Sequence, residues 1–194
     1  MSNFFALISR MRYIERWGLM RSSITENIQE HSHMVAVIAH ALGAISRDVF
    51  GKDCDPCRLA AIALYHDASE IITGDLPTPV KYNSAEIEDA YKKIEENAEN
   101  TLLDMLPQAL KNSFTELFCI DEGSYDAILC KAADRLSAYI KCIEERKTGN
   151  MEFLSAERQT LDRVLSMNLP EVDYFIKNFI PAFEKNLDEL GIMR

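Results

Sequence analysis

LAAIALYHDASEIITGD, residues 59–75, is the segment around which the chain is organised. Its first half is apolar at helical spacing, and the pair His66 and Asp67 follows, with Glu70 one turn further on. Residues three and four apart share a helix face, so His66 and Glu70 project together and Asp67 lies to one side. Two metal-ligand residues and a carboxyl proton carrier this close together predict a functional site, provided that partners arrive from elsewhere in the fold.

The composition indicates a single all-α domain. The chain has 194 residues, of which 47% are hydrophobic, with only seven glycines and six prolines. That length supports one substantial core, and the long runs at helical spacing leave no room for a parallel sheet. We therefore expect residues 1–194 to form one helical bundle.

Cysteine usage and hydropathy bear on the compartment. No apolar run approaches the roughly 20 residues that a membrane span needs. Five cysteines make no disulfide framework, so we expect a cytoplasmic protein without a membrane partner. Cys54 and Cys57 have the CxxC spacing of redox and zinc sites. A structural interpretation is better, because Asp55 suits a helix N-cap, Pro56 suits the first helical position, and the sequence has no second CxxC.

The formal net charge of -10 argues against nucleic acid as a partner. Binding to a phosphate backbone depends on basic surface and counterion release, and this chain is acidic. A small phosphorylated substrate remains compatible with the charge, since a metal ion and one or two local Arg or Lys side chains reverse the field inside one pocket.

Apolar spacing predicts the helices. Ser23 and Glu26, at capping-box spacing, mark one possible start of the second helix. The glycine and the two spaced prolines of residues 73–82 predict a stiff, extended loop. The expected helical ranges are 3–13, a second helix that contains residues 31–49, 56–72, 84–105, a shorter helix after Pro107, 124–147, 151–167, and 171–190 with an interruption at Pro181.

His31 is the first candidate partner for the pair at residues 66 and 67. It heads an apolar stripe of the second helix, whereas His33 and His40 fall off that stripe. A lone histidine on an apolar face is more often a hydrogen-bonded core residue than a ligand. Antiparallel packing of this helix on the helix that ends in His66 would, however, bring the two imidazoles together.

Asp134 is the second candidate partner. It lies in the middle of an apolar helix with small neighbours, and a buried carboxylate is costly unless it is paired or bound to a metal. An ion pair with Lys131 or Arg135 is the structural interpretation, and a metal is the functional one. Proximity to His66 and Asp67 would decide between them.

Arg16 and Trp17 form a further candidate element. The structural alternative is a tryptophan that closes the core beside an arginine at its rim. The functional interpretation is an arginine fork for a phosphate beside a flat apolar wall for a sugar or base. The loop at residues 73–82 would then offer backbone groups, a carboxylate and a hydroxyl to the same ligand.

The order His31, His66–Asp67, Asp134 resembles that of the HD-domain metal-dependent phosphohydrolases. The flanking sequence is similar to the bacterial 5′-deoxynucleotidase (YfbR-like) branch of that family, over nearly the whole chain. The segments that carry the resemblance are 16–21 (RWGLMR), 25–27 (TEN), 30–32 (EHS), 65–70 (YHDASE), 73–82 (TGDLPTPVKY), 138–142 (AYIKC), 173–175 (DYF) and 179–181 (FIP).

The resemblance implies an all-helical homodimer that hydrolyses deoxyribonucleoside 5′-monophosphates to deoxyribonucleosides and phosphate. Arg16 would orient the phosphate, Trp17 would lie against the sugar, and Glu70 or Asp75 would serve the water or the leaving oxygen. The implied metal ligands are His31, His66, Asp67 and Asp134, and the implied substrate-binding residues are Arg16, Trp17, Asp67, Asp75, Leu76, Pro77, Thr78 and Asp134.

The chemistry of these side chains agrees with one divalent ion. Two imidazoles and two carboxylates suit Co, Mn, Ni, Fe or Zn and select none of them. Only four histidines occur in the chain and none follows residue 66, so one metal is simpler than two. Residues 135–137 (RLS) depart from the small or apolar residues expected after the metal aspartate, which could alter the pocket wall and the substrate range.

Three other interpretations remain open. A nucleoside triphosphate triphosphohydrolase or a phosphodiesterase could use the same scaffold, although such substrates need more basic side chains than Arg16, Lys81, Lys131 and Arg135 offer. A non-catalytic helical module could hold a structural metal. A helical protein without any metal is the third, and four ligand-type residues on apolar helix faces argue against it.

Overall fold

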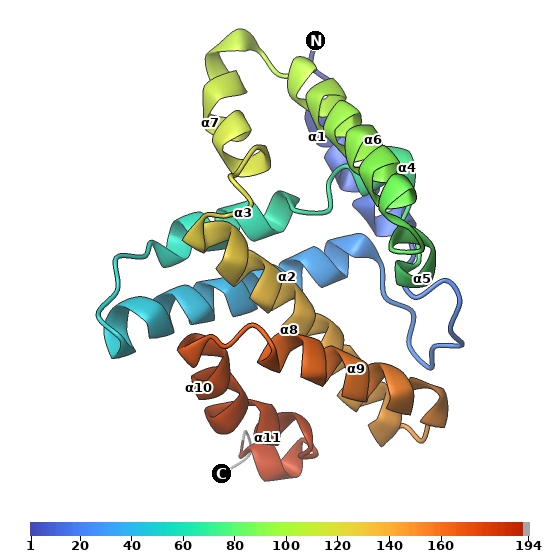
Figure 1. Cartoon of the computed structure of the whole chain (residues 1–194), viewed down its shortest axis with the longest axis vertical. Helices are drawn as coiled ribbons and strands as arrows, with labels where there is room; N and C mark the ends of the chain where they lie inside the picture. The colour runs from blue at the N-terminus through green and yellow to red at the C-terminus, as the bar shows by residue number, and fades with distance from the viewer. Residues whose placement is uncertain (192–194) are drawn as a thin grey trace.

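The computed structural model describes residues 1–191, and in that range every regular element is helical (Figure 1). The all-α prediction is therefore confirmed. None of the described helices is both long and apolar enough to cross a membrane. The helices are α1 (Phe4–Ile8), α2 (Ile28–Ala44), α3 (Pro56–Tyr65), α4 (Glu70–Thr73), α5 (Thr78–Lys81), α6 (Ala85–Asp104), α7 (Gln108–Phe118), α8 (Tyr125–Lys147), α9 (Leu154–Leu165), α10 (Pro170–Asn178) and α11 (Ile180–Phe183), with 3₁₀ turns at Ser9–Tyr13, Met151–Phe153 and Asp188–Leu190 and a π-helical turn at Ile45–Val49.

Side-chain caps explain where several of these helices begin. Asn27 Oδ1 accepts from the backbone N–H groups of residues 29 and 30, so α2 starts after Asn27 and the predicted start at Ser23 is wrong. Asp55 caps α3 in the same way, with Pro56 in the first turn. This geometry supports the structural interpretation of the CxxC motif. Ser84 and Ser124 cap α6 and α8 where the sequence predicted.

The predicted helix over residues 56–72 is interrupted. α3 ends at Tyr65, and tight turns lead to α4 at Glu70. The interruption has a local cause, because His66 Nδ1 lies 2.7 Å from the Ala63 carbonyl oxygen, which a continuous helix would bond to the N–H of residue 67. The predicted extended loop at residues 73–82 is also partly wrong, since α5 forms within it with Pro79 in its first turn.

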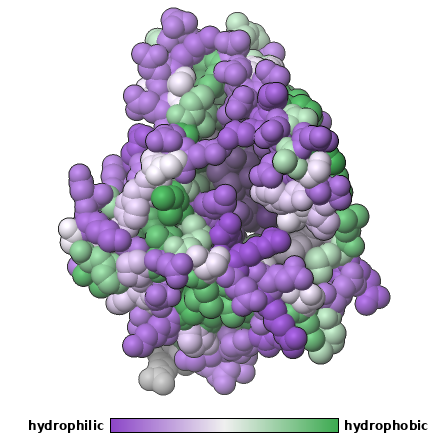
Figure 2. Space-filling model, viewed as in Figure 1, coloured by the Kyte–Doolittle hydropathy of each residue, from purple (hydrophilic) through white to green (hydrophobic). Residues whose placement is uncertain are grey.

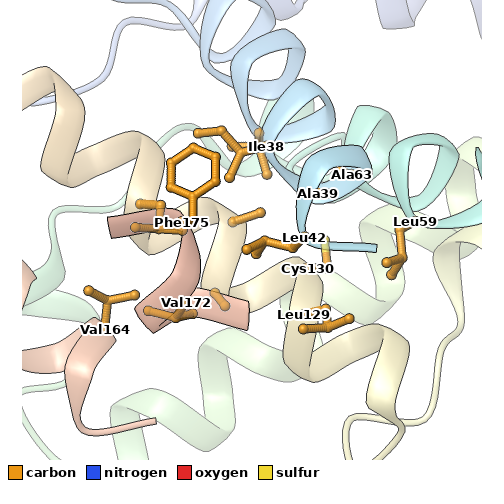
Figure 3. Packing of buried hydrophobic residues seen from close by; sticks show 14 of the residues in the cluster. Ile38, Ala39, Leu42, Leu59, Ala63, Leu129, Cys130, Val164, Val172 and Phe175 are labelled. Atoms are coloured by element: carbon orange, nitrogen blue, oxygen red, sulfur yellow. The ribbon is translucent and has the colours of Figure 1, made fainter. Parts of the chain in front are cut away.

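The main core lies where α2 packs against α3 and α8, and α10 closes it from the other side of α2. Figure 3 shows these side chains meeting between the helices: Ile38, Ala39 and Leu42 from α2, Ala63 and Leu59 from α3, Leu129 and Cys130 from α8, Val164 from α9, and Val172 and Phe175 from α10. A second cluster forms around Phe4, Ala68 and Leu102, beneath α1, α6 and α7. The residues that follow the His66–Asp67 pair therefore sit between two cores.

Gly43 sets how closely α2 and α3 approach each other. A Cβ atom at this position would lie 2.8 Å from Leu59 Cδ1 and 2.9 Å from Pro56 Cα. Real Cβ atoms do not come so near to backbone atoms, so only glycine allows this crossing.

Two helical faces with apolar side chains at helical spacing are only partly buried. On α6, Tyr91, Ala98 and Leu102 are buried, but Ile87 and Ile94 are exposed. At the end of the chain, Phe175 is buried, Tyr174 and Phe183 are half-buried, and Phe179 is exposed at the break between α10 and α11. The break itself confirms the interruption predicted at Pro181, because proline is tolerated in the first turn of a helix and not in its interior.

A buried carboxylate anchors residues 21–24, the strap that leads into α2. Glu145 is 1% exposed and accepts hydrogen bonds from the backbone N–H groups of Ser23 (2.8 Å) and Ile24 (3.2 Å) and from Asn150 Nδ2 (2.8 Å). Lys141 Nζ donates to Glu145 and to the Ile24 carbonyl oxygen. Burial opposes ionisation of Glu145, but Lys141, Asn150 and the two backbone donors outweigh it and lower its pKa to about 2.

Replacement of Glu145 by glutamine should lower the free energy of unfolding by about 3 kcal/mol, because it leaves the buried Lys141 ammonium without its counter-charge. A carboxyl with a depressed folded pKa contributes stability above its ordinary value of 4.5 and loses it as the pH falls to about 2. The free energy of unfolding of the parent, measured with urea, should therefore fall as the pH is lowered between these limits. Glu145→Gln should reduce this dependence on pH. An unchanged slope in the variant would contradict the assignment.

Candidate active site

The four predicted metal ligands converge from three helical segments. His31 comes from α2, His66 and Asp67 come from the turn after α3, and Asp134 comes from the middle of α8. His31 Nε2 lies 3.0 Å from Asp134 Oδ1 and 3.6 Å from Asp67 Oδ2, and His66 Nε2 lies 3.1 Å from Asp67 Oδ2. Ligand atoms of His31, His66 and Asp134 all lie within 4.8 Å of one another. Carboxylate and imidazole atoms thus surround one small volume.

The residues present fit a divalent metal ion. His66 Nδ1 is within hydrogen-bond distance of the Ala63 carbonyl oxygen, which favours the tautomer with a free lone pair on Nε2. His31 Nδ1 lies 3.4 Å from Ser137 Oγ, so its Nε2 also faces the cluster. Among residues 1–191, neither buried Nε2 atom makes a hydrogen bond of acceptable geometry. Two such nitrogens beside two carboxylates are a donor set for a first-row transition metal.

Strong electrostatic coupling accompanies this arrangement. Burial lowers the pKa of His66, but the Asp67 carboxylate outweighs it and raises that pKa to about 9. Burial likewise opposes ionisation of Asp67, yet His66, His31 and Arg16 hold the pKa of its carboxyl well below the usual range. Asp134 behaves similarly, because the His31 imidazole 3.0 Å from its carboxylate outweighs burial and lowers its pKa. Both carboxylates are therefore ionised at neutral pH.

Asp134 has neither of the ion-pair partners that the structural interpretation offered. Within the described chain, Lys131 and Arg135 form no salt bridge with it, and Arg135 Nη1 instead donates to the Arg163 carbonyl oxygen at 2.9 Å. The partner of Asp134 is His31, which is the outcome that favours the metal interpretation.

Glu70 and Asp75 border the cluster. Glu70 is 7% exposed, and its Oε2 has no hydrogen-bond partner in the described part of the chain. Burial, and then the charges of Asp67 and Asp75, raise the pKa of Glu70 to about 9. Asp75 is half-buried, and burial raises its pKa as well. A buried carboxyl with a free oxygen is suited to hold or move a proton.

Arg16 and Trp17 lie beside the cluster and share a partner, Glu26, for which the sequence indicated no functional role. Arg16 Nη1 donates to Asp67 Oδ2 at 3.2 Å and its Nε donates to Glu26 Oε2 at 3.3 Å. Trp17 Nε1 donates to the same oxygen at 2.9 Å, and the indole packs on Phe153 with ring centroids 5.2 Å apart. Glu26 fits a capping-box pattern and lies in segment 25–27 of the family resemblance, but neither pattern indicated that it binds Arg16 and Trp17.

A cavity of about 810 Å³ opens beside these groups. Figure 2 shows this face of the molecule hollowed near its centre, with hydrophilic residues around the opening. Of the predicted substrate-binding residues, Asp67 and Leu76 are half-buried and are not among the residues that line the cavity, whereas Asp75, Pro77, Thr78 and Asp134 are. The full lining is Arg16, Trp17, Gly18, Leu19, Met20, Asp75, Pro77, Thr78, Pro79, Tyr82, Lys131, Asp134, Arg135, Ala138, Ala156, Gln159, Thr160 and Arg163.

Similar solved structures have the same fold. An HD-domain phosphohydrolase from Listeria innocua superposes with a TM-score of 0.81 at 24% identity, covering 93% of this chain and 88% of that one. The cyanophage S-2L HD phosphohydrolase DatZ, solved with dA and one catalytic Zn²⁺ ion, has a TM-score of 0.63 at 22% identity, covering 93% and 96%. At these identities the likeness establishes the HD-domain fold.

Sequence comparison is more specific. The 5′-deoxynucleotidase from Shewanella oneidensis is 50% identical over the full length of both chains. The 5′-deoxynucleotidase YfbR from Shigella boydii is 47% identical over 98% of this chain and 96% of that protein. The family model for YfbR-like 5′-deoxynucleotidases matches residues 3–183. The chain belongs to the YfbR-like 5′-deoxynucleotidase family of HD-domain proteins.

Proposed function

We propose that this protein hydrolyses deoxyribonucleoside 5′-monophosphates to deoxyribonucleosides and inorganic phosphate, with one divalent metal ion. The observation that carries the proposal is the convergence of His31, His66, Asp67 and Asp134 on one volume, beside Arg16 and an open cavity. Family membership supplies the reaction, because relatives about half identical to this chain carry the name 5′-deoxynucleotidase.

His31, His66, Asp67 and Asp134 would hold the ion. One ion is favoured because the other two histidines, His33 and His40, are exposed on α2. The donor set accepts Co, Mn, Ni, Fe or Zn. A single catalytic Zn²⁺ in the cyanophage relative agrees with the number of ions. When bound, such an ion lowers the pKa of water and neutralises phosphoryl charge.

The side chains of the protein would supply binding and proton transfer. Arg16, held by Glu26 and Asp67, presents a guanidinium to the phosphoryl oxygens. Glu70 would position the attacking water or take its proton, and Glu70 or Asp75 would protonate the departing 5′ oxygen. Burial of Glu70 limits bulk water around the reacting groups.

The nucleoside would occupy the cavity between Trp17 and the segment from Asp75 to Thr78. Trp17 would present an aromatic face to the sugar, and Pro77 and Thr78 line the same cavity. Leu76 would support this wall from behind, because it is half-buried outside the lining. Two short helices, α4 and α5, hold the segment at both ends.

A phosphate-release assay tests the proposal. Metal-stripped protein should be inactive toward deoxyribonucleoside monophosphates, and each divalent ion should be added back in turn, with ribo and deoxy substrates compared side by side. Free phosphate is the expected product. Release of tripolyphosphate from a nucleoside triphosphate would instead favour a triphosphohydrolase. Hydrolysis of a phosphodiester would favour a phosphodiesterase.

Trp17 should determine sugar selectivity. If its ring packs against C2′, a ribose hydroxyl is excluded or buried without a partner, at a cost of roughly 1 to 3 kcal/mol, which corresponds to about 5-fold to 160-fold discrimination. Trp17→Ala should therefore bring the kcat/KM ratio of deoxy to ribo monophosphates close to one. Leu19→Ala, which alters an exposed residue of the same cavity, should preserve the ratio of the parent. An unaltered ratio in Trp17→Ala would refute the idea.

We also propose that the chain works as a single domain, as a homodimer and in the cytoplasm. The cavity draws on residues from Arg16, which precedes α2, to Arg163 of α9, and α10 packs on the same core, so the site needs almost the whole chain. Ile72, Ile87 and Ile94 are exposed apolar side chains on α4 and α6 that a second copy could cover. All five cysteines are free, as in a reducing compartment. Light scattering measures the oligomeric state.

A further inference from the structure

One carboxylate oxygen connects the two residues that would face the substrate. Glu26 Oε2 accepts from Trp17 Nε1 at 2.9 Å and from Arg16 Nε at 3.3 Å. The side chains of Arg16 and Glu26 are each 15% exposed. Arg16 then reaches Asp67 through its Nη1 atom. A continuous chain of charged and polar contacts therefore runs from the indole, through Glu26 and Arg16, to the metal-ligand cluster.

The backbone reinforces this connection. An isolated antiparallel bridge pairs Glu15 with Asn27, and the Arg16 N–H donates to the Glu26 carbonyl oxygen at 2.9 Å. These backbone contacts alone hold Glu26 beside Arg16, independently of the Glu26 side chain. At the Glu145 end, the strap at residues 21–24 is tied to α8, which restrains the intervening segment on both sides.

Trp17 adopts a conformation that it would not choose by itself. Its φ angle is +61°, in the left-handed region that residues with a Cβ atom rarely occupy. Such a conformation persists only where surrounding contacts impose it. The contacts on its side chain are the hydrogen bond to Glu26 and the packing against Phe153.

We propose that Glu26 is a positioning residue that joins the phosphate-facing Arg16 to the sugar-facing Trp17, so that both are oriented as one unit. The consequence for catalysis rests on the proposed function, whereas the structural link does not. Loss of the Glu26 charge should release the indole and the guanidinium together. Phosphate binding and sugar selection would then change in parallel, although Glu26 contacts neither the phosphate nor the sugar.

The chain offers a direct readout, because Trp17 is its only tryptophan. All indole fluorescence therefore reports on this residue, with or without metal or substrate. Glu26→Gln should shift the emission maximum and increase quenching by acrylamide in the resting protein. Glu15→Gln is the matched control, since Glu15 is exposed and joins the bridge through its backbone. It removes the same charge one residue away from Arg16 and should leave the emission of the parent.

Kinetics of the metal-loaded protein complete the test. Glu26→Gln should lower kcat/KM for deoxyribonucleoside monophosphates by about tenfold or more, because it weakens a charge-assisted hydrogen bond on each partner. The preference for deoxy over ribo substrates should fall in the same variant. Glu15→Gln should keep both values. A merely structural role of Glu26 would lower the melting temperature without altering sugar preference.

Arg16→Lys keeps Glu26 and covers the case in which Glu26→Gln folds poorly. It removes the guanidinium Nε that shares Glu26 Oε2 with Trp17, so it should alter Trp17 emission through Glu26. Parental emission in a folded Arg16→Lys protein would overturn the inference. A folded Glu26→Gln protein with parental emission and parental sugar preference would overturn the inference. If emission shifts but the parent releases no phosphate from any nucleoside monophosphate, the proposed function fails and the link between Glu26 and Trp17 stands.

Discussion

Asp134→Asn should abolish phosphate release and weaken metal binding together. The substitution keeps the shape of the side chain but removes the negative charge that faces His31 Nε2 at 3.0 Å. A bound divalent ion supplies several kcal/mol of transition-state stabilisation, so its loss should reduce kcat/KM by at least about 10³-fold. Metal content after dialysis, measured by mass spectrometry, should fall with activity.

Asp162→Asn is the control for this prediction, because Asp162 is an exposed residue of α9. It removes an equal charge and should leave metal content and kcat/KM at the values of the parent. Full metal occupancy together with full activity in Asp134→Asn would exclude Asp134 from the ligand set and would remove the main support for the proposed site.

Glu70→Gln should separate catalysis from metal binding. Glutamine matches a protonated glutamate in shape, and within the described residues the Glu70 side chain forms no hydrogen bond or salt bridge with His31, His66 or Asp134, so the ion should remain bound. A positioned proton carrier contributes typically 10²–10⁴-fold, and kcat should fall by about that factor. A protein with a purely structural metal would lose nothing, so this variant also tests the non-catalytic alternative.

Glu99→Gln provides the matched comparison. Glu99 is half-buried and, like the buried Glu70, has a raised pKa; its value of about 7 results from burial and from the neighbouring Glu95 and Glu96. It lies on α6 and is not among the residues of the cavity. Equal losses of kcat in the Glu70 and Glu99 variants would indicate a general effect of neutralising acidic groups and would dismiss the assigned role of Glu70.

The candidate site could be inferred from the sequence because its proposed ligands interrupt otherwise apolar patterns. His31 at the head of a stripe, and Asp134 within an apolar helix, are residues that a core does not need. Their spacing along α2 and α8 agrees with the helical period, so their faces followed from sequence. Their meeting point did not, because it depends on how α2, α3 and α8 cross.

The errors arose where side chains compete with backbone hydrogen bonding. His66 was expected inside a helix, but its imidazole takes the Ala63 carbonyl oxygen and the helix ends there. Ser23 and Glu26 satisfy a capping-box pattern, yet Asn27 is the cap and Glu26 is bound to Arg16 and Trp17 instead. A local pattern cannot show that a side chain has a better partner elsewhere.

Polar contacts between residues far apart in the sequence could not be predicted either. Glu145 reads as one charge among several at the end of a helix, and nothing in its neighbours signals that it binds backbone 121 and 122 residues away. Ser137 was noted as a departure from the family pattern, and the structure places its hydroxyl beside His31 Nδ1. Such partners become visible only once tertiary packing is known.

Because α2 and α3 cross closely at Gly43, the relative positions of the proposed metal ligands depend on a residue far from the site. Gly43 lies twelve residues from His31, about 18 Å along the axis of α2. Alanine is the better helix former by about 1 kcal/mol, so Gly43→Ala should strengthen an isolated α2 peptide. In the folded protein the added methyl group would clash with Pro56 and move α2 away from α3, and so displace His31 relative to His66. A substitution that stabilises the isolated helix would thus reduce the activity of the folded protein, although it lies at the opposite end of α2 from His31.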